Sequence, residues 1–209
     1  MKNKKLVALT ALLCLLPMVF GLILWERLPE QMPTHFGANN EPDGWSSKPF
    51  AVFGLPLIVM GLHLLCVFGT RADPKYDNIN RKIMNLVLWI CPLISSFVGG
   101  LMYAYALGQE VRFGFFVSLL IGVVFVIVGN YLPKSRQNYT MGIKIPWTID
   151  DSENWNATHR FAGRLWMVAG VLMIVMAWFE QPWVFLPVVL LMVFAPIVYS
   201  YLFYRRKTR

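Results

Sequence analysis

Charge is scarce in this sequence, and histidine and cysteine are scarcer still. Of 209 residues only 14% are charged, three are histidine and three are cysteine, whereas 57% are hydrophobic. A typical soluble domain has about 25% charged and about 45–50% apolar residues. A soluble fold of this length would have no interior large enough for so much apolar surface. The composition therefore excludes an ordinary soluble globular domain.

Signatures of catalysis and cofactor binding are also absent. The sequence contains no HExxH, no GxSxG, no P-loop and no dinucleotide-binding fingerprint. The three cysteines, Cys14, Cys66 and Cys91, lie in apolar runs and form no CxxC pair. This pattern is typical of small packing residues rather than of a disulfide framework. We therefore expect no enzyme activity and no cofactor.

Long apolar runs are what the sequence contains instead. About 20 helical residues cross a hydrocarbon core of ~30 Å, and six runs reach that length. Five carry no charge, and the sixth carries only Arg164 near its start. The runs are Leu6–Trp25, Pro49–Thr70, Ile83–Gln109, Phe113–Pro133, Phe161–Phe179 and Gln181–Tyr204. The sequence predicts an all-α polytopic membrane protein with six transmembrane helices, kinked where a proline such as Pro17 lies inside a run.

The distribution of lysine and arginine predicts the orientation. One side of the predicted membrane holds 16 of the 19 basic residues and the other side holds three. The basic side faces the cytoplasm. Both termini and the long loop 134–160 are then cytoplasmic, and the long loop 26–48 is external. The same bias explains the net charge of +8 without a nucleic-acid partner.

The two long loops occupy equivalent places in two sets of three helices. Each follows the first helix of its set, and because three is odd the second set enters the membrane from the opposite side. This layout is that of a 3+3 inverted repeat, which many transporters use. It predicts an N-terminal unit of residues 1–110 and a C-terminal unit of residues 111–209. The alternative is that uneven loops in a six-helix protein resemble a repeat by chance.

The external loop is rich in residues that form turns. The segment 42–44, Pro-Asp-Gly, predicts a tight turn that presents Trp45 at the membrane interface. His35, Glu41 and Asp43 could be proposed as metal ligands. Their spacing matches no closed zinc site, so we expect an ordinary structured loop.

The cytoplasmic loop has a weak alternation over Asn138–Ile149, which is compatible with a short hairpin or an irregular cap. Asp150 or Asp151 can cap the helix that follows. Arg160 and Arg164 lie one helical turn apart on that helix. They are either anchors whose charged ends reach the interface or a site for acidic groups or lipid phosphates.

A few polar residues lie inside or near the ends of the runs. His63 lies well inside an uncharged run, and such a residue suggests a function by default, although a neutral histidine bonded within the bundle is the alternative. Asn85 and Asn130 are expected to bond across helices. Residues 95–100 contain two overlapping small-xxx-small pairs, which predict close packing of the third helix.

Two stretches resemble the SdpI family of bacterial membrane proteins and the N-terminal domain of unknown function that accompanies it. They are the external LPEQMPTHFG…PDGW and the cytoplasmic GNYLPKSRQNYTMGIKIPWTIDDSENWNATHRFAG. The resemblance implies an immunity protein in the bacterial plasma membrane. It implies a secreted, membrane-active toxin peptide outside and a small helix-turn-helix repressor recruited inside. It implies neither catalysis nor direct contact with nucleic acid.

The resemblance also indicates candidate site residues. The external candidates for contact with a ligand are His35, Phe36, Gly37, Asp43, Gly44 and Trp45. The cytoplasmic candidates for contact with a partner are Asn130, Arg136, Asn138, Gly142, Pro146, Trp147, Trp155, His159, Arg160 and Gly163, to which Lys144 and Arg164 are added for their charge. His63 is the intramembrane candidate.

These observations favour an immunity and sensing protein in contact with membrane lipids. A small transporter or channel is the first alternative, because the repeat, His63 and the proline-broken helices would suit a mid-membrane site. A membrane-embedded enzyme is the second alternative and would need His35 or His159 to bind metal or relay protons. The sequence does not address the oligomeric state.

Overall fold

The computed structural model describes residues 4–37, 39–179 and 182–208, and it forms two compact units. Unit 1 comprises Met1–Gly69 and Met84–Phe113, and unit 2 comprises Thr70–Ile83 and Gly114–Arg209. Each unit is described by itself below. The assignment of residues 1–110 and 111–209 to two domains stays a prediction.

Six helical segments of the described chain are long and apolar enough to cross a membrane, which confirms the predicted fold class. They are Lys4–Ile23, Phe50–Arg71, Arg81–Ala106, Phe113–Lys134, Ser152–Ala177 and Phe185–Lys207. The start predicted for the last run, Gln181, lies outside the described residues. The orientation and the inverted repeat stay predictions.

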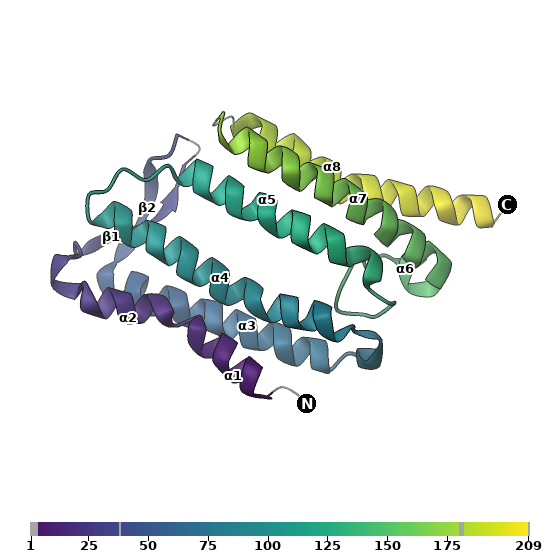
Figure 1. The fold of residues 1–209 in the computed structure, drawn as a ribbon, viewed down its shortest axis with the longest axis horizontal. Helices are drawn as coiled ribbons and strands as arrows, with labels where there is room; N and C mark the ends of the chain where they lie inside the picture. Colours follow the sequence, from purple (N-terminus) through teal and green to yellow (C-terminus); the bar gives the residue numbers. More distant parts are fainter. Residues whose placement is uncertain (1–3, 38, 180–181, 209) are drawn as a thin grey trace. The chain divides into compact units, whose positions relative to one another are not determined.

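The first span of unit 1 is broken into α1 (Lys4–Leu13) and α2 (Leu16–Ile23), as Figure 1 shows. Pro17 lies in the first turn of α2, where its missing N–H costs no helical hydrogen bond. The N–H of Met18 donates to Leu15 O and not to Cys14 O, so the regular ladder is interrupted. The break predicted at this proline is confirmed.

A short turn η1 (Trp25–Arg27) leads into a β-hairpin within the loop 26–48, outside the six apolar helices. Strand β1 (Gln31–Phe36) pairs antiparallel with β2 (Pro42–Ser47), with irregularities of register around Thr34 and Asp43. The turn predicted at residues 42–44 is wrong because these residues belong to β2. The chain reverses at Gly37–Glu41, where Gly37 N donates to Glu41 O (2.8 Å) and Asn40 has φ 64°. Asparagine tolerates this left-handed conformation better than most residues.

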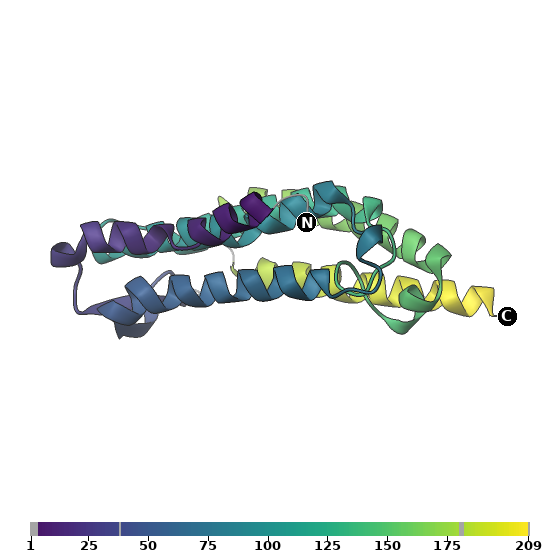
Figure 2. The ribbon, with the colours of Figure 1, turned by 90° about the horizontal axis from the view of Figure 1, so that it is seen from below.

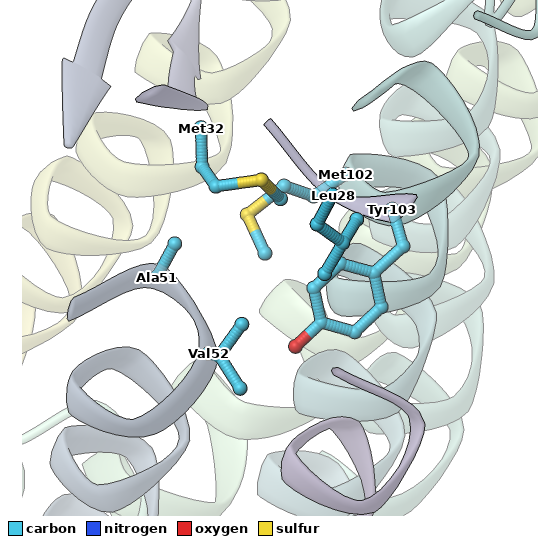
Figure 3. Close-up of a cluster of buried hydrophobic side chains, with 6 residues drawn as sticks. All are labelled: Leu28, Met32, Ala51, Val52, Met102 and Tyr103. Carbon is cyan, nitrogen blue, oxygen red and sulfur yellow. The ribbon is translucent and has the colours of Figure 1, made fainter. Parts of the chain in front are cut away.

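The hairpin leads into a π-helical turn η2 (Phe50–Gly54), α3 (Leu55–Arg71) and, beyond a loop, α4 (Arg81–Ala106). Figure 2 shows the hairpin at the start of the helical segment formed by η2 and α3. Figure 3 shows six side chains that point toward one another here: Leu28, Met32, Ala51, Val52, Met102 and Tyr103. All six are buried, so this cluster holds the root of the hairpin against η2 and α4.

Helix α4 packs against the break between α1 and α2. Ser95 Oγ donates to Cys14 O (2.8 Å), and Tyr103 Oη donates to Pro17 O (3.0 Å). A Cβ added to Gly99 would lie 2.9 Å from Pro17 Cβ. The close packing predicted for residues 95–100 is confirmed at Ser95 and Gly99. The carbonyl of Cys14, which Met18 leaves without its helical donor, is thereby satisfied across helices.

Unit 2 contains η3 (Tyr76–Asn78), most of α5 (Phe113–Tyr131), η4 (Leu132–Lys134), α6 (Pro146–Asp150), α7 (Ser152–Ala177) and α8 (Pro182–Lys207). Helix α6 lies beside the start of α7 (Figure 1) and also contacts α8. Residues 134–151 are all described and contain no strand, so the irregular-cap alternative is the correct one. The predicted helix cap is confirmed at Asp151, whose side chain accepts from Glu153 N (2.9 Å).

Helices α5 and α7 approach each other so closely that only glycine fits at the contacts. A Cβ on Gly122 would lie 2.8 Å from Gly170 O, and one on Gly170 would lie 2.6 Å from Gly122 O. Gly129 and Gly163 oppose each other in the same way, at 2.8 and 2.7 Å. The two crossings lie seven residues apart on each helix. Backbone therefore meets backbone twice along this antiparallel pair.

Candidate functional site

The candidate residues fall into two separate sets. The hairpin site comprises residues 31–47 in unit 1. The loop site comprises residues 70–83 and 134–164 in unit 2. Each is built below from its own contacts.

In the hairpin site, His35 and Asp43 face each other across the two strands. His35 Nδ1 is hydrogen-bonded to the Asp43 carboxylate, and the two side chains are 74% and 55% exposed. Gly44 lies opposite His35, and a Cβ there would lie 2.8 Å from His35 Cβ. Glu41 bonds Asn39 instead of joining the pair (3.0 Å). Gly44 therefore allows the strands to close, and the pair is an exposed polar surface feature.

Phe36 has a structural role rather than a free surface. Its ring stacks on Phe113 with centroids 3.5 Å apart and meets Tyr105 edge-on at 5.2 Å. Since Phe113 begins α5 and Tyr105 ends α4, these rings tie the hairpin to the neighbouring helix ends within unit 1. Gly37 follows directly and starts the chain reversal, where its missing side chain leaves room for Asn39.

Trp45 is the exposed aromatic residue of the hairpin site. It lies on β2 opposite Pro33, and 53% of its surface is accessible. Exposure alternates along β2, so Asp43, Trp45 and Ser47 share one open face. This face can contact a partner through an acid and an indole.

The sequence offered no reason to expect the buried Lys48 at the base of the hairpin. Its ammonium lies 2.7 Å from Glu30, donates to Trp25 O at 3.3 Å and lies 5.1 Å from the centroid of the Trp25 ring. Only 5% of the residue is exposed. This cation is therefore used within the protein and adds little positive charge to the surface of the hairpin.

The centre of the loop site is Asp73, which sequence reasoning missed. Its carboxylate accepts from Lys75 N, Tyr139 N and Thr140 Oγ1, each at 2.8 Å. Burial alone would raise the pKa of Asp73, but these donors outweigh it and hold the pKa below its ordinary value of 3.8. Asp73 thus joins the loop between α3 and α4 to the loop after α5.

Two neighbouring amides organise the rest of the loop. Gln137 Nε2 donates to Thr148 O and Ile149 O, and its Oε1 accepts from Lys75 Nζ at 3.0 Å. Asn138 is buried, and its Oδ1 accepts from Thr140 N and Met141 N at 3.0 and 2.6 Å. Asn138 is therefore a turn-forming residue and offers no surface to a partner.

His159 fixes the loop from the side of α7. Its Nε2 accepts from Ile143 N (3.0 Å), so the proton must be on Nδ1, which donates to Trp155 O (2.7 Å). Gly142 has φ 117°, and a Cβ there would lie against His159 Nε2 and 3.1 Å from the Trp155 ring. Only glycine fits this backbone and this space.

Trp155 and its neighbours complete a buried polar layer on α7. Trp155 Nε1 donates to Ser135 O at 2.8 Å, and its ring stacks on His159. Asn154 Nδ2 donates to Ser200 O at 3.0 Å, while Asn154 Oδ1 accepts from Ser200 Oγ and Thr158 Oγ1. Five of these residues are fully buried, namely Asn154, Trp155, Thr158, His159 and Ser200. These residues hold α7 against the loop and against α8.

Pro146 and Trp147 belong to the short helix α6. Pro146 is its first residue, and Thr148 Oγ1 donates to Ile143 O (2.7 Å) just before it. The Trp147 ring lies 5.2 Å from Tyr201 and 6.2 Å from Tyr204, both on α8. Three aromatic residues therefore gather at one level, as is common near a membrane interface.

The exposed candidates of the loop site are the cations. Arg136, Lys144, Arg160 and Arg164 are exposed, and their charged ends make no hydrogen bond or ion pair with the described residues. Asn130 is also exposed and accepts from Lys134 Nζ at 3.5 Å within its own segment. This bond joins neighbouring turns and not two helices, in contrast to our expectation for Asn130. Gly163, by contrast, is buried in the contact with Gly129 and is not available to a partner.

His63 is fully buried in unit 1 and has a partner. Its Nε2 lies 3.0 Å from Thr10 Oγ1, on the neighbouring helix α1. This hydrogen bond matches the structural alternative for an intramembrane histidine. Among the described residues, no three or more histidine, cysteine, aspartate or glutamate side chains are grouped to hold a metal ion.

Comparison with known proteins finds a family model that matches each of the two regions that contain the hairpin site and the loop site. Residues 134–200 match the model of the SdpI/YfhL protein family, and residues 12–60 match a domain of unknown function, DUF1648. The immunity protein SdpI of Bacillus subtilis is 25% identical over 97% of each chain. About a third of the chain, residues 134–200, is therefore similar to the SdpI/YfhL family. The predicted resemblance is thereby confirmed.

A second relative is similar to a smaller part of this chain. An uncharacterized protein of Archaeoglobus fulgidus is 32% identical over 40% of this chain and 49% of its own length. No solved structure matches the chain. The family segment begins at Lys134 and extends into α8, so it contains the buried layer of Asn138, Trp155 and His159.

Proposed function

We propose that this multi-pass membrane protein gives its cell immunity to a secreted, membrane-active peptide and that it acts without catalysis. The observation that supports the proposal is the similarity to an immunity protein over 97% of both chains. A match of that extent includes the hairpin site and the loop site together. Similarity limited to one segment would have supported a shared module only.

In this proposal the hairpin faces the outside of a bacterial plasma membrane, and both termini face the cytoplasm. The support is the excess of lysine and arginine near the ends that carry the loop site. A peptide arriving from outside would meet the face of β2 with Asp43 and Trp45. An exposed tryptophan beside an acid suits a ligand with both apolar and cationic groups.

The proposal includes a sensing step at the loop site. The loop is held by hydrogen bonds to Asp73 and His159 and not by strands of its own, so a second arrangement would begin with the exchange of these bonds for others. That arrangement would capture a small helix-turn-helix repressor through Arg136, Lys144, Arg160 and Arg164. Peptide binding can shift the balance only if the peptide prefers one of the two arrangements.

Resistance is the first test. The chain is expressed in a sensitive host, which is challenged with a peptide against which the Bacillus subtilis immunity protein protects. Cells with an empty vector and cells with that immunity protein are the controls. We expect survival close to that of the positive control. Killing as in the empty-vector cells, with the protein shown to be in the membrane fraction, would remove the proposal.

Orientation and sensing have separate tests. In a cysteine-free variant, Ser47→Cys should react with an impermeant maleimide in intact cells, and Lys144→Cys should react only after lysis. The opposite pattern would invert the topology. For sensing, a tagged helix-turn-helix repressor from the host of a resistance operon should reach the membrane fraction only in cells given the peptide. Arg136→Glu combined with Lys144→Glu should abolish the recruitment of the repressor to the membrane fraction. Unchanged recruitment would contradict the role of these cations.

A further inference from the structure

Helix α7 of unit 2 carries two arginines on the same face as a stripe of exposed valines. In order along the helix this face contains Arg160, Arg164, Val168, Val171 and Val175, at spacings that place side chains on one side of a helix. The three valines, called the valine stripe below, are 61%, 51% and 46% exposed. They belong to a helix long and apolar enough to cross a membrane. In a membrane, such an exposed apolar stripe faces lipid acyl chains.

Contacts with α8, which lies beside α7 (Figure 1), place Arg160 near the level of the lipid headgroups. The next residue, Phe161, stacks on Tyr199 of α8 with ring centroids 4.5 Å apart. Tyr199 lies two residues, or about 3 Å, before Tyr201 on that helix. Tyr201 in turn meets the ring of Trp147. Since tryptophan and tyrosine gather at the membrane interface, Arg160 lies close to that interface.

Arg164 lies one helical turn, roughly 6 Å, closer to the valine stripe. A guanidinium among acyl chains is unfavourable, so a long arginine side chain reaches back to the interface. Side chains of a helix tilt toward its N-terminus, and on α7 this direction leads from Arg164 toward Arg160. Residues four apart on a helix have Cβ atoms about 5–6 Å apart. The two guanidinium groups can therefore meet one ligand at the interface.

Neither guanidinium has a partner in the part of the chain that the structure describes. Arg160 and Arg164 are exposed and form no hydrogen bond or ion pair there. The closest acid on the same face, two turns before Arg160, is Glu153, and its carboxylate lies 2.9 Å from Lys207 Nζ. The carboxylate of Asp151 lies 2.8 Å from the same ammonium. The acids at the start of α7 are thus engaged with another cation.

The surrounding loops increase the positive charge. Segments 70–83 and 134–164 together contain nine basic and five acidic residues. Of the five acids, Asp73 is buried in hydrogen bonds of the loop, and Asp151 and Glu153 are paired with Lys207. The remaining two acids do not balance the excess of cations. A ligand at this end of α7 should therefore carry net negative charge.

We propose that Arg160 and Arg164 bind the phosphate of an anionic glycerophospholipid whose acyl chain lies along the valine stripe. The planar guanidinium group suits paired hydrogen bonds to phosphate oxygens. A zwitterionic lipid has the same phosphate but also a cation of its own, which the excess of basic residues repels. The inference goes beyond the proposed function, since this lipid would be bound whether or not a peptide is sensed. Arg136 and Lys144 then stay open to a soluble partner.

The test measures lipid binding to the full chain by native mass spectrometry, from micelles with equal amounts of phosphatidylglycerol and phosphatidylcholine. We expect phosphatidylglycerol to be retained. Arg160→Gln combined with Arg164→Gln should weaken its binding about thirtyfold, from about 1 kcal/mol per arginine. Arg81→Gln combined with Lys82→Gln is the matched control and should leave the binding nearly unchanged. It removes the same charge from exposed side chains of unit 2 that are adjacent in sequence and so do not face each other.

Two outcomes of this measurement would overturn the proposal. Equal weakening by the two double variants would show that net charge alone attracts the lipid, without a site on α7. Equal retention of phosphatidylcholine by the wild-type chain would show that the arginines do not select an anionic headgroup.

A second measurement uses only the wild-type chain and does not depend on the folding of a variant. Phosphatidylglycerol with a photoreactive acyl chain is added to phosphatidylcholine nanodiscs, and mass spectrometry locates the cross-links. They should concentrate at residues 164–175. Cross-links spread evenly over the six spans would overturn the proposal. Displacement of the lipid by inorganic phosphate would assign the arginines to a free anion instead, and its displacement on dimer formation would assign this face to a second copy of the chain.

Discussion

The two units bring their helices together by different means. In unit 1, side-chain hydroxyls of α4 bond to the carbonyls of Cys14 and Pro17 beside the break between α1 and α2. In unit 2, α5 and α7 touch through glycine backbone at Gly122 with Gly170 and at Gly129 with Gly163. The first kind of contact leaves a groove of about 300 Å³ beside it, between α2 and α4. The second kind leaves no room for even a methyl group.

The buried polar groups differ in the same way. Unit 1 buries single pairs such as Thr10 with His63, whereas unit 2 buries a connected layer around Asn154, Trp155 and His159. A connected layer is more costly to damage because each loss leaves several partners unsatisfied. Unit 2 should therefore be the less tolerant of substitution, and unit 1 the more tolerant.

The largest effect should come from a side chain placed between α5 and α7. Gly163→Leu forces a Cβ to within 2.7 Å of Gly129 O and of Pro133, where backbone and a ring must move. We expect a loss of about 3 kcal/mol, the upper end for overpacking. Unfolding of the purified protein in mixed micelles, followed by tryptophan fluorescence, measures this loss.

The control for this variant is Gly69→Leu, where an added Cβ meets nothing within 4 Å. It adds the same apolar side chain and should leave the unfolding midpoint unchanged. A stable Gly163→Leu protein would show that α5 and α7 can separate without loss, and the proposed contrast between the units would disappear.

The second prediction compares the buried polar groups. Asn154→Leu removes three hydrogen bonds, which join it to Ser200 and Thr158. Thr10→Val removes one bond between helices, to His63, besides local bonds to Leu6 O and Val7 O in its own helix. Hydrogen bonds inside membrane proteins average about 0.6 kcal/mol each, so we expect losses of about 2 and about 0.6 kcal/mol. The same unfolding assay measures both. Equal losses would mean that the layer in unit 2 is no more cooperative than a single pair.

Much of the fold could be predicted because it depends on local pattern. The length of the apolar runs predicted the six spans, and Pro17 predicted the break in the first of them. The preference of aspartate for the N-cap position predicted that α7 starts after Asp151. Each of these signals acts within one segment of sequence. None requires knowledge of which segment lies opposite.

What could not be predicted depends on distant partners. The hairpin turn is at Asn40 and not at Pro42, because the register is set by the bonds between β1 and β2. Asp73 gains its role from Tyr139 and Thr140, which lie more than 60 residues away. One signal was available: Gly122 and Gly129, like Gly163 and Gly170, are seven residues apart. This equal spacing could have indicated the glycine contacts.

The third prediction concerns Asp73 and pH. Because its pKa in the folded protein lies below 3.8, Asp73 stabilises the fold above that value, and this contribution is lost as pH falls through the lowered pKa. The protection of the amides at residues 138–143, measured as the exchange rate relative to the intrinsic rate at the same pH, should therefore decrease as the pH falls below about 4. In Asp73→Asn the same amides should already be less protected at neutral pH, because their loop loses a charged acceptor. The free energy of opening at residues 138–143 should be lower by about 1.5 kcal/mol.

Asp151 must be separated from this effect. The hydrogen bond from Lys207 Nζ holds its pKa below 3.8 as well, so it titrates in the same direction. Its loss should affect amides in the first turn of α7 and not those at residues 138–143. If Asp73→Asn keeps the acid-induced change at 138–143, Asp73 does not hold the loop.

The smallest effect should come from the exposed pair His35 and Asp43. Since both side chains are more than half exposed, water competes for the bond, and such pairs contribute about 0.2–1 kcal/mol. A double-mutant cycle with His35→Asn and Asp43→Asn should give a coupling near the lower end, reduced further by salt. Phe36→Ala should cost several times more, because it removes the ring packed against Phe113 and Tyr105. A coupling above about 1.5 kcal/mol would mean that the hairpin site, like the loop site, depends on a polar pair that water does not reach.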